Sequence, residues 1–474
     1  MDLSMTVAGY LARLSPRLAG IATRLIGSPF RYLSGIPMER QLLILKLPVA
    51  RLAIVNDLAV VKTLLTDQEG AFPKSNDLEM LLRPLIGRGV FGQPGGDAVK
   101  QMRRVYIRAL SQILEAEVAR IARHFTRQYM AAWQQAQRPV PIPSELSRLA
   151  IDIVTQATLG NCFSVQESQR FVDLFFKYHK RANPLLLLLT PREPASRQAL
   201  FDSFGLEDIG AEMRALIRGR FLDPLLDEKS DARLAPFASA LLESTGVANG
   251  VGMPLDQDER RQTAILDEIA VMLLAGHETT ASVLSWLLWE LADMPGEQDT
   301  IGQLLQSPGE GQSDAIPADQ GLRQDLAPGR LAALIQESLR LYPPIAFLLR
   351  ETKKDVVFRE RLIPADSFVV VSPWIIQRHR RLWQNPDMFD PERWLPADSP
   401  PAMANRSAFI PFGQGPRVCP GKRFADVEMQ SILSELLRGY RFSRTGGRPP
   451  QPLGSLTSRP DRDFKLRVAP PRLP

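Results

Sequence analysis

Apolar residues recur along most of this chain at three- and four-residue steps, the spacing of amphipathic α-helices, and strand-like alternation is confined to short segments. Helices are expected at residues 57–65, from 97 through 109, in several stretches between 110 and 240, and at 258–292, 330–341 and 420–438. Short strands are expected at 41–46, 50–55 and within 345–373. Strands and helices do not alternate as a parallel α/β sheet requires. The pattern therefore predicts a mainly α fold with a small β-rich part.

Segments rich in glycine or polar residues predict loops at 87–96, 246–254 and 307–321. The first 39 residues form a separate pattern, in which apolar side chains recur at helical spacing and Arg13, Arg17 and Arg24 interrupt the apolar runs. The interruptions argue against a spanning helix or a signal peptide. Two readings stay open: a helix docked on the protein body, or a basic helix at a membrane surface. Residues 40–474 are expected to form one catalytic domain.

Composition removes several classes of protein. Hydrophobic residues make up 45% of the 474 positions and charged residues 23%, which is ordinary for a globular protein. The net charge of +6 is small and scattered, so nucleic acid is not an expected partner. The chain has two cysteines and four histidines, too few thiolates for an iron–sulfur cluster or a disulfide scaffold. A reducing cytosol, and hence a cytoplasmic location, fits this cysteine usage.

Cys419 has the setting of a metal-ligating thiolate. It follows Phe412-Gly413-Gln414-Gly415-Pro416-Arg417-Val418 and precedes a predicted helix, whose free N–H groups and positive dipole end are expected to lower its pKa. Gly415 and Gly421 are expected to let the backbone approach a flat cofactor, and Arg417 suits a carboxylate. The alternative is a buried, inert cysteine. Cys162 has no comparable setting and reads as a buried thiol.

A polar break interrupts the long apolar helix expected at 258–292. The hexapeptide Ala275-Gly276-His277-Glu278-Thr279-Thr280 lies inside it, and Asp267 and Glu268 argue against a membrane span. Glycine is costly inside a helix, and threonine hydroxyls can bond carbonyls four residues earlier. The hexapeptide is therefore expected to open a polar notch in an apolar wall. The alternative makes Glu278 a core acid satisfied by a nearby arginine or lysine.

These two segments together resemble the cytochrome P450 family. The cysteine segment matches, at every specified position, the family's haem-binding pattern of Phe, two spacers, Gly, spacer, Arg, spacer, Cys, spacer, Gly, and the hexapeptide resembles the family's oxygen-binding motif. The resemblance covers about residues 40–470. It implies the triangular-prism P450 fold, with haem between the long central helix and the cysteine loop.

The resemblance also implies roles for these residues. Cys419 becomes the axial ligand of the haem iron. Thr279 becomes the hydroxyl that hydrogen-bonds the bound oxygen, Glu278 becomes the acid of a proton relay, and Gly276 leaves room above the iron. The remaining haem-binding residues implied here are Phe412, Arg417 and Gly421.

A charge network is implied by two further segments. Glu337 and Arg340 lie three residues apart on one helix face, and Arg393 follows in a Pro-Glu-Arg segment. By resemblance the three side chains form a buried network that locks the cysteine loop, a structural role. His379 is expected to help order the fold, whereas His124 and His277 are assigned no role.

Haem propionates need cations, and the resemblance names Arg103, Arg350 and Arg417. The alternative for each is a solvated surface charge. Val99 stands where the family usually has Trp or His, so one propionate contact is in doubt, and Lys100 is the expected substitute.

The implied activity is a haem b monooxygenase, which inserts one atom of O2 into a hydrophobic substrate such as a fatty acid, a terpenoid or a polyketide-like compound. Electrons are expected from NAD(P)H through a separate ferredoxin or flavodoxin and its reductase, docked on a basic face of Lys100, Arg104, Lys422 and Arg423. A monomer without a transmembrane segment is expected, with peripheral membrane contact left open. Two other classes remain: a haem-thiolate peroxygenase, isomerase or dehydratase, and a haem-binding protein without catalysis. The intact Glu278-Thr279 pair favours the monooxygenase.

An apolar pocket is expected, by resemblance, from residues 81–91, 185–189, 271–275, 345–348 and 455–457. Residues 185–189 could equally be a plain helix end or an entrance lip.

Overall fold

The structure is a computed structural model that describes residues 39–46, 50–67, 70–93, 95–190, 192–227, 235–244, 257–306, 326–395, 406–454 and 456–471. The expected N-terminal helical segment before residue 39 and the expected loops at 246–254 and 307–321 lie outside the described residues.

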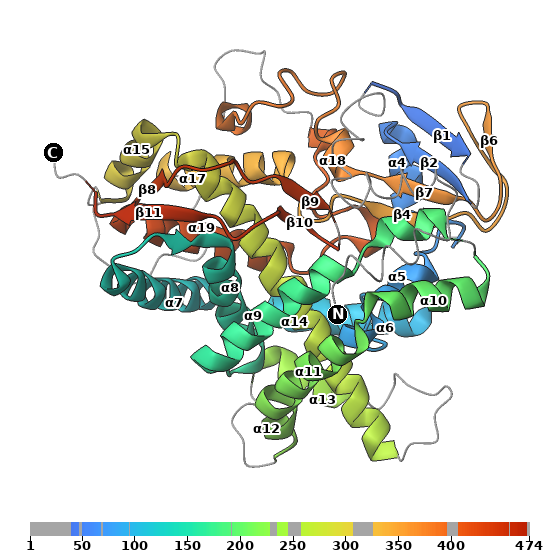
Figure 1. The fold of residues 1–474 in the computed structure, drawn as a ribbon, viewed down its shortest axis with the longest axis horizontal. Helices are drawn as coiled ribbons and strands as arrows, with labels where there is room; N and C mark the ends of the chain where they lie inside the picture. The colour runs from blue at the N-terminus through green and yellow to red at the C-terminus, as the bar shows by residue number, and fades with distance from the viewer. Residues whose placement is uncertain are drawn as a thin grey trace.

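Helices make up most of the described chain (Figure 1). The α-helices are α4 (Leu58–Leu65), α5 (Asn76–Ile86), α6 (Asp97–Gln112), α7 (Glu115–Ala136), α8 (Ile142–Leu159), α9 (Val165–Arg181), α10 (Pro194–Phe204), α11 (Glu207–Ile217), α12 (Asp223–Leu226), α13 (Pro236–Ser244), α14 (Gln257–Leu291), α15 (Pro295–Gln306), α17 (Leu326–Leu341), α18 (Pro373–Ile376) and α19 (Lys422–Gly439). Short 3-10 or π turns are η2 (Pro184–Leu189), η3 (Arg218–Leu222), η5 (Pro391–Trp394), η6 (Arg406–Ala408) and η7 (Gly415–Arg417).

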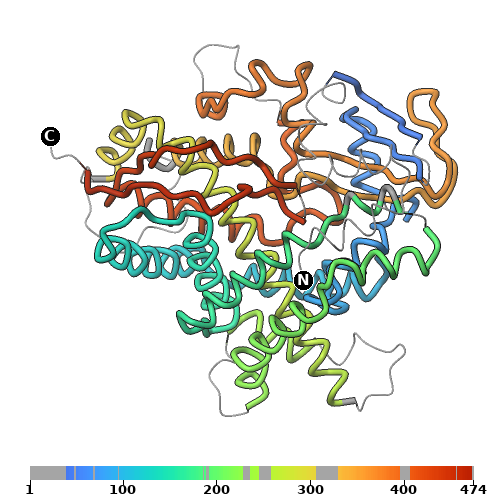
Figure 2. Tube along the Cα trace, in the orientation of Figure 1, coloured from blue at the N-terminus to red at the C-terminus, as the bar shows by residue number. Residues whose placement is uncertain are grey.

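Four small sheets complete the described fold. The largest has the order β1-β2-β7-β4, in which β2 and β7 are parallel and the other pairs antiparallel. The second has the order β3-β11-β8, and β9 and β10, like β5 and β6, form two-stranded pairs. The strands are β1 (Leu42–Lys46), β2 (Arg51–Val55), β3 (Val140–Pro141), β4 (Leu348–Glu351), β5 (Val356–Phe358), β6 (Arg361–Ile363), β7 (Phe368–Val371), β8 (Arg441–Arg444), β9 (Pro452–Gly454), β10 (Ser458–Pro460) and β11 (Lys465–Ala469). In Figure 2 the red C-terminal strands run back across the molecule, and Ser282 of α14 donates to the carbonyl of Ser458 there.

Helix α14 passes through the middle of the molecule and belongs to two hydrophobic cores (Figure 1). Its residues 265–274 pack in one core with α5, α9 and α11. Its residues 281–291 pack in a second core with α8, α17 and α19. The polar hexapeptide 275–280 lies between the two cores. The helix continues through this stretch, and the ring of His277 packs against Phe171 and Phe175 of the first core.

The main elements expected from the sequence are confirmed. Both N-terminal strands are present, and Asp57 caps α4 by accepting hydrogen bonds from the N–H groups of Ala59 and Val60. Helix α17 begins four residues before the expected start, at Leu326. The helix expected from residue 420 begins at Lys422. Pro420 and Gly421 therefore belong to the loop, and Cys419 lies three residues before the helix.

Candidate functional site

A cavity of about 1150 Å³ lies between α14 and the segment that carries Cys419. Its walls are mostly apolar and come from α5, α6, α14, α19, η2 and the four-stranded sheet. Each segment expected to line it contributes, with the lining residues Leu82, Val90, Phe91, Leu187, Val271, Met272, Leu274, Ala275, Ile345, Ala346, Phe347, Leu348, Leu456 and Thr457. The sequence did not indicate a further wall from β1 and β2, made by Leu43, Leu45, Leu52 and Ile54. Those strands showed an apolar face but no motif that placed it at a site.

The segment before α19 holds Cys419 through its backbone. The N–H of Cys419 donates to the carbonyl of Phe412 at 2.9 Å, and the N–H of Val418 donates to that of Gly415 at 3.0 Å. Burial raises the pKa of the Cys419 thiol, whereas the N–H of Gly421 and the charge of Arg103 lower it. The expected net lowering is therefore wrong for the protein alone, because desolvation outweighs both favourable contacts. A coordinating metal would supply the missing stabilisation, since it deprotonates its thiol ligand outright.

Gly415 has a packing role that the sequence did not indicate, whereas Gly421 lines the cavity. Gly415 has a φ of +72°, and a Cβ there would lie 2.3 Å from the carbonyl oxygen of Leu65 in α4. A Cβ on Gly421 would be 3.9 Å from the Cys419 sulfur, which is ordinary contact. Gly415 thus lets the loop pack against α4.

Gly276 and Thr279 of the hexapeptide line the cavity. The Thr279 hydroxyl donates to the carbonyl of Ala275 at 2.8 Å, the back-bonding expected from the sequence. A Cβ on Gly276 would lie 2.6 Å from the Val154 side chain of α8. Gly276 is therefore also needed for close helix packing. His277 points away, with Nδ1 2.5 Å from the carbonyl of Leu273 and its ring against Phe175.

Glu278 does not line the cavity. Its carboxylate accepts a hydrogen bond from the Thr457 hydroxyl at 3.2 Å and lies 3.5 Å from Arg459. His179 of α9 lies 2.9 Å from the same hydroxyl. Burial raises the pKa of Glu278, and Arg459 and Thr457 lower it. The reading of Glu278 as a core acid satisfied by an arginine thus matches its contacts in this structure.

Four cations meet at one end of the cavity: Arg103, Arg350, Arg417 and Lys74. Arg103, Arg350 and Lys74 donate to the backbone carbonyls of Val418, Leu349 and Phe91. Burial and Arg417 lower the pKa of Arg350 to about 10. Burial and the three arginines lower the pKa of Lys74 well below its usual value. Such mutual repulsion inside a protein indicates a site for an anionic group.

Lys74 is a residue that sequence reasoning missed, because a lone lysine before α5 belongs to no motif. Lys100, the expected substitute for the missing partner at Val99, is exposed and pairs with Asp97 at 3.0 Å. Val99 does line the cavity. The cation that accompanies the three arginines is therefore Lys74, and only the folded chain brings it there.

Glu428 of α19 was also missed. It lines the cavity, is 1% exposed, and accepts a hydrogen bond from the Thr280 hydroxyl at 2.9 Å through Oε2. Its Oε1 is buried and has no hydrogen-bond partner among the described residues. Burial raises the pKa of Glu428 to about 8, and Thr280 lowers it. A buried carboxyl facing a cavity is a functional-site signal that appears only in three dimensions.

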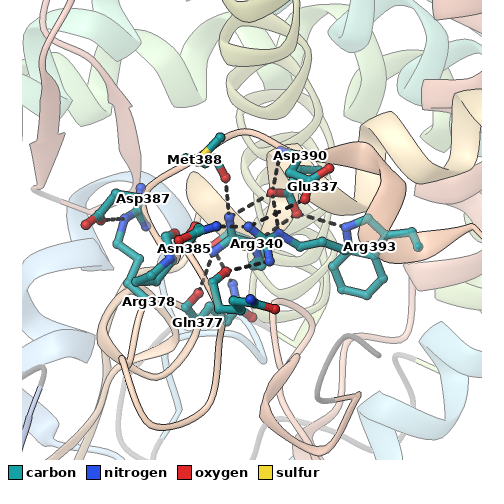
Figure 3. A network of polar contacts seen from close by, with 12 residues as sticks. Glu337, Arg340, Gln377, Arg378, Asn385, Asp387, Met388, Asp390 and Arg393 are labelled. Carbon is teal, nitrogen blue, oxygen red and sulfur yellow. Dashed lines mark hydrogen bonds and ion pairs between the residues drawn. The ribbon is translucent and has the colours of Figure 1, made fainter. Parts of the chain in front are cut away.

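Glu337, Arg340 and Arg393 meet in a buried network (Figure 3). Arg340 forms two hydrogen bonds to Glu337, at 2.7 and 2.9 Å, and Arg393 adds one at 3.3 Å. The remaining donors of Arg340 bind the carbonyls of Gln377, Pro386 and Met388. Gln377 in turn accepts a hydrogen bond from the N–H of Ile410 at 2.8 Å. This bond connects the network to the segment that leads into the cysteine loop.

One helix of the described residues, Asp258–Leu291, is long and apolar enough to cross a membrane by composition. Its most apolar stretch is 78% buried inside the protein, as expected for a core helix.

These features define a class of protein. A thiol faces the cavity from one side, a helix with a polar hexapeptide forms the other side, and cations gather at one end. This arrangement fits haem: Cys419 for the iron, apolar walls for the porphyrin, and Lys74 and the arginines for the two propionates. The class is that of the haem-thiolate proteins.

The chain belongs to the cytochrome P450 family, whose sequence profile, described as Cytochrome P450, matches residues 40–468. It is 26% identical over 458 residues to Cyclooctatin synthase of Streptomyces melanosporofaciens, covering 94% of this chain and 93% of that protein. It is 29% identical over 347 residues to Cytochrome P450 4c21 of Blattella germanica, covering 70% of this chain and 64% of that protein. The crystal structure of the cytochrome P450DA heme domain superposes with a TM-score of 0.70 at 21% identity, over 94% of this chain and 93% of that one. The expected fold class and the identification as a cytochrome P450 monooxygenase are thereby confirmed.

Proposed function

We propose that this chain is a haem b monooxygenase that inserts one atom of O2 into a neutral, largely apolar substrate, hydroxylation being the main outcome. The observation that carries the proposal is that Cys419, Thr279 and the four cations line one and the same cavity. Haem, when bound, supplies the redox chemistry and the site for O2. The protein residues supply binding, orientation and protons.

The substrate side of the cavity supports the apolar character of the substrate. Its walls are leucine, isoleucine, valine, phenylalanine and methionine side chains. Ala275 and Thr279 of the hexapeptide also line it. Lys74 and the three arginines lie at the end of the cavity that carries Cys419, where they would bind the haem propionates. Tyr106 also lines the cavity, but its hydroxyl binds Glu268. A terpenoid or polyketide-like compound therefore fits better than a fatty acid whose carboxylate is buried in the site.

Proton delivery is proposed to involve Thr279 and Glu278. The Thr279 hydroxyl faces the cavity and holds the carbonyl of Ala275. Glu278 is held by Thr457 and Arg459 behind the cavity wall, so its carboxyl has to leave these partners to exchange a proton with the Thr279 side. Burial raises the pKa of Glu278 and outweighs the Arg459 charge, so the proton-bearing carboxyl is favoured more than in an exposed glutamate, which suits a proton donor.

Electrons are proposed to come from NAD(P)H through a ferredoxin or flavodoxin and its reductase, in a cytoplasmic, monomeric protein. Lys422 and Arg104 are exposed on the Cys419 side. Arg423 pairs with Glu115 and Lys100 with Asp97, so their charges are partly compensated. Lys422 is accordingly the better test: Lys422→Glu should slow reduction by an acidic donor and leave the haem spectrum unchanged. An unchanged reduction rate would refute this docking face.

The central experiment is spectroscopic. The haem-loaded chain, reduced under carbon monoxide, should show the absorption band of thiolate ligation, and Cys419→Ser should lose it. A screen of apolar compounds for spin-state shifts should then yield ligands among neutral hydrocarbons and their oxygenated relatives. A nitrogen-ligated spectrum, or hits confined to long-chain carboxylates, would contradict the proposal.

A further inference from the structure

Two adjacent acids of α14, Asp267 and Glu268, have no part in the site described above. They are 5% and 6% exposed and are not among the lining residues of the cavity. Burying two carboxyl groups is costly unless other groups bind them. Their partners come from two segments that are distant from α14 in the sequence, and from Tyr106 of α6.

The first segment is the loop after α5. The N–H of Arg88 donates to Asp267 Oδ2 at 2.8 Å, and the N–H of Val90 donates to Glu268 Oε1 at 3.0 Å. Tyr106 of α6 donates to Glu268 Oε2 at 2.9 Å and so fixes the orientation of that carboxyl. The two acids therefore bind the loop backbone itself, whatever side chains the loop carries.

Glycines in the loop allow this close approach. A Cβ on Gly87 would lie 2.0 Å from Asp267 Oδ1, and φ there is +54°. A Cβ on Gly89 would lie 2.4 Å from the Val271 side chain of α14. Contact with α14 thus explains two glycines of the expected loop at 87–96, Gly87 and Gly89.

The second segment is α11. Arg214 lies with Nη2 2.7 Å from Asp267 Oδ1, and its Nη1 donates to the carbonyl of Leu85 at the end of α5 at 3.2 Å. One guanidinium therefore joins α11, α14 and the start of the loop. A Cβ on Gly210, one turn earlier in α11, would lie 2.4 Å from the carbonyl of Pro84, so the two helices are also in close contact.

The loop held in this way carries part of the cavity wall. Val90 and Phe91 line the cavity, and Phe91 is 37% exposed, so this part of the cavity wall borders the protein surface. Val90 is itself the residue whose N–H binds Glu268. A displacement of the loop from α14 would therefore move this wall directly.

We propose that Asp267, Glu268 and Arg214 form a clasp that controls how readily apolar ligands enter and leave the cavity. The clasp ties the wall at Val90 and Phe91 to α14, and Arg214 makes release of that wall depend on movement of α11. The three are positioning residues, since none of them touches the cavity. The inference rests on the proposal that the cavity admits an apolar substrate.

The test uses the full haem-loaded chain and the apolar haem ligand 4-phenylimidazole, mixed in a stopped-flow instrument. Arg214→Met should raise both the association and the dissociation rate constants, the latter about tenfold, the factor expected for loss of one charge-assisted hydrogen bond. Hydrogen exchange at the amides of Arg88 and Val90 should accelerate to a similar extent. Asp267→Asn keeps the shape and one acceptor oxygen, and should show a smaller change in the same direction.

Arg170→Met is the matched control, because Arg170 of α9 pairs with Glu212 of α11 at 2.5 Å without contacting the loop or α14. It should behave as the parent protein in both measurements. The clasp is refuted if Arg214→Met and Asp267→Asn retain the thiolate spectrum and match Arg170→Met in ligand rates and loop exchange. If Arg214→Met loses the spectrum, Asp267→Asn decides by the same criterion. Failure of the haem-site proposal would be separate, since the parent protein would then show no spectral change with the ligand.

Discussion

The hydroxyl of Thr280 donates a hydrogen bond to Oε2 of Glu428 across 2.9 Å and so links α14 to α19. Helix α14 carries the hexapeptide 275–280, and α19 follows the cysteine loop. The bond lies at the cavity wall, which both residues line. It fixes the spacing of the two sides of the site through one neutral contact, since burial keeps the Glu428 carboxyl protonated at neutral pH.

This contact gives a prediction about stability and pH. The folded-state pKa of Glu428, about 8, is raised above the ordinary value of 4.5, so the folded protein holds a proton that the unfolded chain releases. Its contribution to the free energy of unfolding is fully present below pH 4.5 and is lost as the pH rises through 8. Between pH 5 and 8.5, the urea concentration at which Glu428→Gln unfolds should therefore vary less with pH than that of the parent protein.

Glu268 also contributes to the pH dependence of stability, because burial raises its pKa to about 8 as well. The single variant should remove part of the slope, and Glu428→Gln with Glu268→Gln together should remove more. If the slope of the unfolding free energy is the same in the parent and in Glu428→Gln, Glu428 is ionised in the folded protein.

Lys74 provides a second prediction. It adds a fourth cation beside Arg103, Arg350 and Arg417, and propionate binding would relieve their mutual repulsion. Lys74→Met should speed transfer of haem to an excess of apomyoglobin by about tenfold, the loss expected for one charge-assisted hydrogen bond. Lys100→Met, which removes an exposed lysine paired with Asp97, is the control and should leave the transfer rate unchanged. Equal rates for Lys74→Met and the parent would place the propionates elsewhere.

The difference between these lysines shows what the sequence could predict. Local structure could be predicted from the sequence, because the Asp57 cap, the hexapeptide in α14 and the loop before α19 depend on neighbouring residues. Lys74 and Glu428 were not readable, because their significance depends on partners far away in the sequence. The prediction of a lowered pKa for the Cys419 thiol was wrong for a related reason. The sequence around Cys419 indicated nearby N–H groups and charges that lower the pKa, but the burial that outweighs them is a property of the folded chain.

The buried network of Figure 3 gives a third prediction. Arg340 is fully buried, and its removal would leave Glu337 buried beside one remaining arginine. Arg340→Met should lower the free energy of unfolding by about 3–5 kcal/mol, measured by urea denaturation. Arg120→Met breaks the exposed ion pair with Glu117 and should cost less than about 1 kcal/mol. A similar small loss in both variants would mean that the network does not hold the segment from Gln377 to Arg393.

Thr279 and Thr280 are adjacent but face different partners, and this separates a role in proton delivery from a role in packing. The Thr279 hydroxyl bonds only one helical turn back, to Ala275, at the cavity, whereas the Thr280 hydroxyl binds Glu428. Thr279→Ala should lower the product formed per O2 consumed by about a hundredfold, because proton transfer by a positioned group typically contributes a factor of about 10²–10⁴. The missing product should appear as hydrogen peroxide, with the carbon monoxide spectrum unchanged. Thr280→Val should instead lower stability and leave the ratio of product to O2 near that of the parent. A normal ratio in Thr279→Ala would remove this hydroxyl from the proton path and leave Glu278, or the buried carboxyl of Glu428, as the group that supplies protons to the site.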